Sequence, residues 1–95
     1  MQTWTESGAI QVTLKIVNTY GICARPAALF AKLANRFDSE ITVARDDNVV
    51  SGKSIMGLLV LEASLGTTIT ITARGHDAAP ALAELADLVN GGFYM

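Results

Sequence analysis

The sequence has few of the residues from which disulfides and metal sites are built. Its 95 residues include one cysteine, Cys23, and one histidine, His76. A lone cysteine cannot form an internal disulfide, so a secreted fold stabilised by disulfides is excluded. Cys23 and His76 by themselves do not complete the ligand set of a structural zinc site. We therefore expect neither a metal nor another cofactor.

Charge is also scarce, since charged residues make up 17% of the chain and the net charge is −2. The seven basic residues are scattered along the sequence rather than clustered. This distribution argues against nucleic acid as a partner, because phosphate contacts need grouped lysine and arginine side chains.

Long apolar runs are missing as well. No stretch reaches the roughly 18 apolar residues of a membrane span, and residues 1–8 lack the basic and then apolar segments of a secretion signal. We expect no membrane insertion and a soluble, cytoplasmic protein. Hydrophobic residues nevertheless form 51% of the chain, enough for the core of a single compact domain over residues 1–95.

Local patterns predict the elements of the first half of the chain. Apolar residues at every second position predict a strand over residues 10–16 with one buried face. Pro26 precedes apolar residues at helical spacing, and proline favours the first turn of a helix, so we expect a helix from Ala24 or Arg25 to Arg36. A turn at residues 46–48 predicts a hairpin between strands at residues 41–43 and 49–50.

The second half continues this alternation. The apolar stretch over residues 55–61 could be a short helix or a strand, and Ser54 as an N-cap favours the helix. Alternating threonines predict a strand over residues 68–73. Asp77 is the expected N-cap of a last helix, which Gly91 and the following glycine end.

These elements give the order β-α-β-β-α-β-α. One amphipathic sheet face and three amphipathic helices predict an α+β fold of two layers, with a four-stranded antiparallel sheet covered on one face by three helices. The apolar residues of the terminal extensions are expected to be frayed or to make intermolecular contacts. These residues are Trp4, Phe93, Tyr94 and Met95.

Cys23-Ala24-Arg25-Pro26 follows Asn18 and Gly21 in one segment, and a second segment begins with Gly52-Lys53-Ser54. Both segments resemble motifs of the HPr family. Residues 18–28 match its active-site signature, N-x-x-G-[IL]-H-A-R-P-A, at every fixed position except one, where Cys23 stands in place of the histidine. Residues 52–58 are similar to the family's regulatory serine motif, and the two motifs have the family's separation. The resemblance covers residues 10–89 and implies the family's open-faced β-sandwich.

The resemblance implies a phosphocarrier rather than an independent enzyme. Family members relay a phosphoryl group from enzyme I to IIA proteins in the phosphoenolpyruvate-dependent sugar phosphotransferase system. An alternative is a regulatory binding module controlled by phosphorylation of Ser54. Its partners would then include a serine kinase or phosphatase and a transcription regulator.

By the same resemblance, Cys23 occupies the phosphoacceptor position, and Arg25 and the backbone amides of Ala24 and Arg25 cradle the phosphate. A helix N-terminus and a nearby arginine both favour a thiolate. A sulfur atom nevertheless lies elsewhere than a ring nitrogen, and in-line transfer is sensitive to displacements of about 1 Å. We therefore expect impaired or altered relay. Three explanations stay open: an engineered replacement of the histidine, a member without relay function, or a phosphocysteine or thiol-reactive variant.

The stretch after Ser54 carries the expected docking residues. Relatives expose an apolar patch here, which implies partner docking by Ile55, Met56 and Leu59, whereas Leu58 and Leu61 are assigned to the core. His76 is remote from Cys23 in the sequence and is expected in the turn before the last helix, not as a replacement phosphoacceptor.

Overall fold

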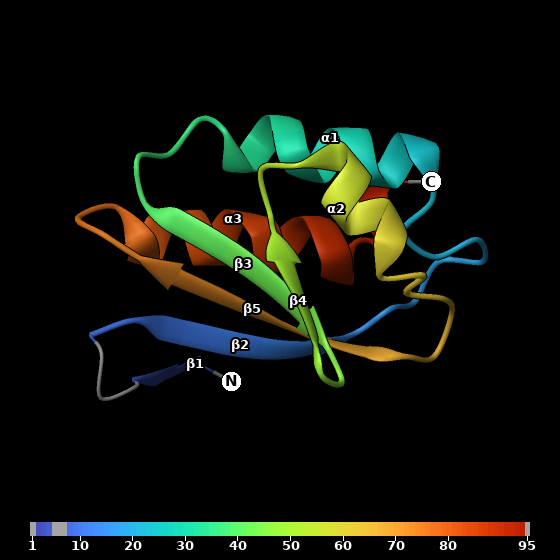
Figure 1. Cartoon of the computed structure of the whole chain (residues 1–95), viewed down its shortest axis with the longest axis horizontal. Coiled ribbons are helices and arrows are strands. Elements are labelled where there is room, and N and C mark those ends of the chain that lie inside the picture. Colours follow the sequence, from blue (N-terminus) through green and yellow to red (C-terminus); the bar gives the residue numbers. More distant parts are fainter. Residues whose placement is uncertain (1, 5–7, 95) are drawn as a thin grey trace.

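One antiparallel sheet with helices on a single face makes up the computed structural model, which describes residues 2–4 and 8–94 (Figure 1). The strands are β1 (Gln2–Trp4), β2 (Ile10–Lys15), β3 (Glu40–Arg45), β4 (Asn48–Ser51) and β5 (Thr68–Arg74). The helices are α1 (Ala24–Ala34), α2 (Ile55–Val60) and α3 (Ala78–Asn90), followed by a short 3-10 helix, η1 (Gly92–Tyr94).

The sheet has the strand order β1-β2-β5-β3-β4, and every neighbouring pair is antiparallel. Val12 of β2 is opposite Ile71 of β5, which in turn is opposite Val43 of β3, so the buried residues of three strands lie in one row under the helices. The polar residues at alternate positions face away, as on the solvated face of an antiparallel sheet. This arrangement confirms the predicted fold class.

The sheet also has a short strand that the sequence patterns did not predict. β1 pairs with β2, from Gln2 opposite Val12 to Trp4 opposite Ile10. Three residues are too few to show a period of two, so only the backbone ladder reveals this strand. The side chains of β1, including Trp4, and residue Met95 lie outside the described residues.

Helix boundaries agree closely with the sequence patterns. α1 begins at Ala24 as predicted and ends at Ala34, two residues before Arg36, because the Asn35 side chain donates to the Ala31 carbonyl and ends the helix there. The stretch after Ser54 is the predicted helix α2. Leu58 and Leu61 are both buried in the core, as expected.

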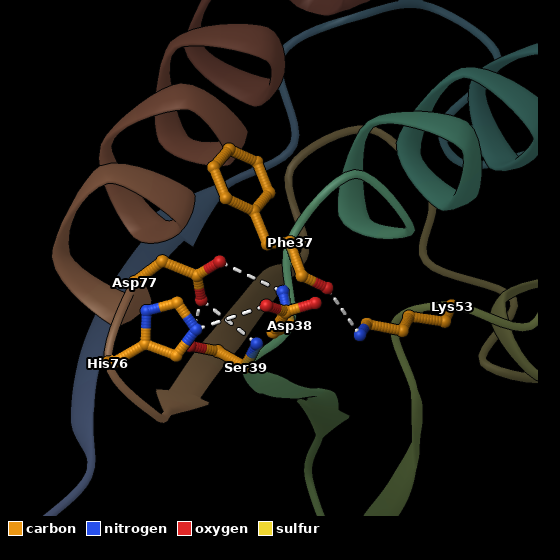
Figure 2. A network of polar contacts seen from close by, with 6 residues as sticks. All are labelled: Phe37, Asp38, Ser39, Lys53, His76 and Asp77. Atoms are coloured by element: carbon orange, nitrogen blue, oxygen red, sulfur yellow. Dashed lines mark hydrogen bonds and ion pairs between the residues drawn. The ribbon is translucent and has the colours of Figure 1, made fainter.

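Asp77 stands at the N-cap position of α3, but the expectation that its side chain caps this helix is wrong. Its carboxylate instead accepts hydrogen bonds from the Ser39 hydroxyl and from the backbone amides of Asp38 and Ser39, at 2.8 and 2.9 Å (Figure 2). These bonds, that of the Ser39 hydroxyl first, lower the pKa of Asp77 to about 2. Asp77 therefore ties the start of α3 to the loop after α1.

The same loop is held on its other side by Lys53. The ammonium group of Lys53 donates to the Phe37 carbonyl at 2.7 Å (Figure 2). The backbone carbonyl of Lys53 accepts from the Asn35 side chain at 3.1 Å. Two segments that are distant in sequence thus fix the connection between α1 and β3.

The end of the chain is part of the core, contrary to the expectation of a frayed tail. Phe93 is 1% exposed and is among the largest fully buried side chains, whereas Tyr94 is 77% exposed. Gly92 and Phe93 both have positive φ, at 63° and 59°, and reverse the chain after α3 so that the Phe93 ring packs inward. Among the helices of the described residues, none is long and apolar enough to cross a membrane.

Candidate functional site

Cys23 lies at the start of α1, in the N-cap position. Its backbone is extended, with φ −96° and ψ −162°, and its carbonyl accepts the first helical hydrogen bond from the Ala27 amide at 2.8 Å. The side chain is exposed and caps no amide in the described part of the chain. The thiol is therefore accessible to a reaction partner.

The residues directly after Cys23 carry groups that favour a negative charge nearby. The amides of Ala24 and Arg25 belong to the first turn of α1, where backbone N–H groups lack partners within the helix. The first turn has no acidic residue, and it contains Arg25, which is exposed. The helix dipole and the guanidinium therefore both favour negative charge at residue 23. This stretch can hold an anionic group on the side chain of Cys23.

The loop before Cys23 is fixed by hydrogen bonds on both sides. The Asn18 side chain donates to the Gly21 carbonyl at 2.8 Å, and the Gly21 amide donates to the Asn18 carbonyl at 3.2 Å. The Ile22 amide donates to the Ala63 carbonyl at 2.8 Å. The sequence identified Asn18 and Gly21 within the motif but contained no local signal for the contact with Ala63, which comes from a segment 41 residues further along (63 minus 22).

Gly21 is required where it stands. Its φ is +64°, and a Cβ atom on it would lie 2.2 Å from the Ala63 carbonyl oxygen and 2.8 Å from the Cα atom of Ser64. Any larger residue would therefore push the loop before Cys23 away from the segment that holds it.

Ser54 caps α2, as the sequence predicted. Its hydroxyl oxygen accepts a hydrogen bond from the Gly57 amide at 3.0 Å, and the side chain is half-buried. Gly57 leaves little space beside it, because a Cβ atom there would lie 3.2 Å from Val50. The hydroxyl is thus held at the N-terminus of a helix, where added negative charge is tolerated.

The expected docking residues differ in their exposure. Met56 is 72% exposed and Ile55 is 44% exposed, whereas Leu59 is partly buried and packs against the core. Two further large apolar side chains are exposed: Val60 at the end of α2, at 69%, and Tyr20 in the loop before Cys23, at 77%. The resemblance placed Val60 in the exposed patch without assigning it to docking, whereas Tyr20 was not singled out, because only the packing shows which apolar residues stay at the surface.

His76 is placed in a different part of the molecule. Its Nε2 atom lies 3.1 Å from a carboxylate oxygen of Asp38, and both side chains are exposed. The start of α3, which follows His76, is at the opposite end of the long axis from the start of α1 (Figure 1). Asp38, His76 and Asp77 offer ligand atoms within 4.8 Å of one another, but these groups already bond to one another and to Ser39.

Comparison with known proteins agrees with this arrangement. Residues 10–91 match the family model described as the PTS HPr component phosphorylation site. The phosphocarrier protein HPr of Neisseria meningitidis is 42% identical over 84 residues, 88% of this chain and 94% of that protein. The HPr-like protein Crh of Bacillus subtilis is 46% identical over 80 residues, 84% of this chain and 89% of that protein.

A solved structure shares the fold closely. The crystal structure of HPr-C-His from Thermoanaerobacter tengcongensis superposes with a TM-score of 0.87 and 41% sequence identity, over 90% of this chain and 96% of that one. The sequence match, the sheet with its three covering helices and the shared fold lead to one conclusion: this chain belongs to the HPr family of phosphocarrier proteins.

Proposed function

We propose that this chain is a phosphate-accepting carrier of the phosphoenolpyruvate-dependent sugar phosphotransferase system, with Cys23 in the phosphoacceptor position. The observation that carries the proposal is the exposed Cys23 side chain at the N-terminus of α1, beside the amides of Ala24 and Arg25. In this role the chain is a cytoplasmic co-substrate of larger proteins, enzyme I as the donor and IIA proteins as acceptors, and not an independent enzyme.

The transfer would use the groups around Cys23 in separate roles. A Cys23 thiolate attacks the phosphorus of phosphorylated enzyme I, so that an S–P bond forms as the N–P bond to the donor histidine breaks. The amides and the Arg25 guanidinium stabilise the charge on the phosphoryl oxygens. A cysteine sulfur does not lie where an imidazole nitrogen would, and in-line transfer loses about 100-fold for a displacement of about 1 Å. Relay through Cys23 is therefore impaired relative to a histidine.

The test measures the intact mass of the protein after incubation with phosphoenolpyruvate and enzyme I. The wild-type chain is compared with Cys23→His as the restored acceptor and with Cys23→Ala as the negative control. We expect rapid phosphate gain by Cys23→His, slow gain by the wild type, and none by Cys23→Ala. No gain by the wild type would refute the carrier role of Cys23. Transfer to the wild type at the rate of Cys23→His would refute the impairment. Phosphate gain by Cys23→Ala would refute the assigned acceptor.

A second candidate function is regulation through Ser54. The supporting observation is that the Ser54 hydroxyl caps α2 directly before the exposed residues Ile55 and Met56. A phosphate at Ser54 would place negative charge at the edge of this apolar surface. It would weaken docking of enzyme I and favour a partner with basic groups, such as a transcription regulator.

The regulatory candidate is tested with a serine kinase that phosphorylates HPr proteins, and ATP. We expect one phosphate on the wild type and none on Ser54→Ala, with Ser64→Ala as a matched control that keeps the acceptor. A Met56→Asp variant then tests whether partners dock on the apolar surface, because it places a charge there without changing Ser54. Unchanged phosphorylation of Ser54→Ala would show that the regulatory site lies elsewhere.

A further inference from the structure

The C-terminal end of α2 is held by an arginine from the sheet. Arg45 is the last residue of β3, and its Nη1 atom donates to the carbonyl oxygens of Leu61 at 2.9 Å and Glu62 at 2.7 Å. The last carbonyl groups of a helix have no partners within it, and a guanidinium both supplies donors and complements the negative end of the helix dipole. Arg45 thus caps α2 from a strand that lies 16 residues earlier in the chain (61 minus 45).

This support is important because α2 is short. The helix has six residues, with no basic residue in its last turn. A helix of this length is unstable by itself and depends on tertiary contacts and caps. Glu62 has a φ of 51°, which ends the helix and turns the chain towards Ala63. The hydrogen bonds of Arg45 therefore fix the point at which the chain leaves α2.

The residue that follows this point holds the loop before Cys23. The Ala63 carbonyl accepts the Ile22 amide at 2.8 Å, and Ala63 and Ile22 are 1% and 4% exposed. Gly21 packs directly against the same carbonyl. Because Ile22 immediately precedes Cys23, the position of Ala63 determines where α1 and its first-turn amides begin.

We propose that Arg45 is a positioning residue for Cys23, acting through the segment 61–63 and Ile22. The inference rests on the proposed function for its effect on phosphate transfer, but its structural part is independent of that function. Among the described residues, Arg45 makes no hydrogen bond to Cys23 or Ser54. It bonds to the segment after α2, and Ala63 of that segment bonds to Ile22 in the loop before Cys23. A change at the end of α2 would thereby be transmitted to the phosphoacceptor.

The first experiment compares Arg45→Met, which keeps the aliphatic stem and removes the donors, with Arg74→Met. Arg74 ends the neighbouring strand β5 and is exposed, and its side chain makes no hydrogen bond to any residue that the structure describes, so its variant is a matched control. The measurement is amide hydrogen exchange by NMR at Ile22, with the Ile71 amide in the centre of the sheet as the reporter of global unfolding.

We expect the Ile22 amide to exchange at least about 10-fold faster in Arg45→Met than in Arg74→Met, as after the loss of a hydrogen bond from a charged donor. The Ile71 amide should change much less. A general loss of stability would accelerate both amides equally, and this result, or an unchanged Ile22 amide, would overturn the proposal.

The second experiment adds each substitution to Cys23→His and measures the initial rate of phosphate gain from enzyme I. We expect a rate about 10-fold lower with Arg45→Met and an unchanged rate with Arg74→Met. Equal rates in the two double variants would overturn the proposed effect of Arg45 on phosphate transfer. If Cys23→His itself accepts no phosphate, the proposed function fails, whereas the exchange experiment still decides whether Arg45 positions the loop.

Discussion

Replacing Gly21 by alanine tests the contact that fixes the loop before Cys23. Gly21 has a φ of +64°, and the new Cβ atom would lie 2.2 Å from the Ala63 carbonyl oxygen. The left-handed backbone costs an L-residue about 1–2 kcal/mol. The overlap forces the two segments apart, which adds about 1–3 kcal/mol of strain and weakens the hydrogen bond from Ile22 to Ala63. We expect a total loss of about 2–5 kcal/mol in the free energy of unfolding.

Gly66→Ala is the matched control for this substitution. Gly66 also has a positive φ, +87°, but a Cβ atom there meets no described atom within 4 Å. The free energy of unfolding of Gly66→Ala should therefore fall only by the backbone cost of about 1–2 kcal/mol.

The two variants are compared with the wild type by urea unfolding followed by far-ultraviolet circular dichroism. The slope of the free energy with urea should stay constant, so that a change in midpoint reports stability. A difference of about 1 kcal/mol or more between the variants supports the clash with Ala63. If Gly21→Ala loses no more free energy of unfolding than Gly66→Ala, the loop is free to move away from Ala63. The proposed fixation of the loop by Ala63 is then refuted.

Three further contacts are tested by the same unfolding measurement. Phe93→Ala should cost about 3–5 kcal/mol because it leaves a cavity in the core, whereas the exposed Tyr94→Ala should change little; equal effects would contradict burial of the tail. Ser54→Ala should cost about 1 kcal/mol through loss of the cap on α2, and no loss would show that the cap is dispensable. Asp77 has a pKa of about 2 in the folded chain against an ordinary value of 3.8, so its contribution is complete above about pH 4 and is lost as the pH falls towards 2. The stability of the wild type should therefore fall more steeply over this range than that of Asp77→Asn, and parallel pH profiles would refute this role.

Much of the candidate site could be predicted because it is continuous in sequence. Cys23, Ala24 and Arg25 are consecutive, and Pro26 places the start of a helix beside them, so no tertiary contact is needed to bring them together. Ser54 was identified in the same way, since an N-cap serine and the helix that it caps are neighbours in the chain. The apolar residues of α2 were harder to assign, because helical spacing alone does not show which of them another element covers.

The sequence by itself determined the order of the elements from β2 to α3 and the two-layer α+β fold. Hydrophobic periods, caps and turns act over a few residues, so each can be recognised in the sequence without the tertiary structure. The tertiary structure alone decided that Asp77 bonds to Ser39 and that Phe93 enters the core. It also decided that Arg45 holds the end of α2 and that Ala63 holds Ile22. The polar contacts join segments that are far apart in sequence. A local pattern does not specify which distant donor or acceptor the packing brings within hydrogen-bond distance.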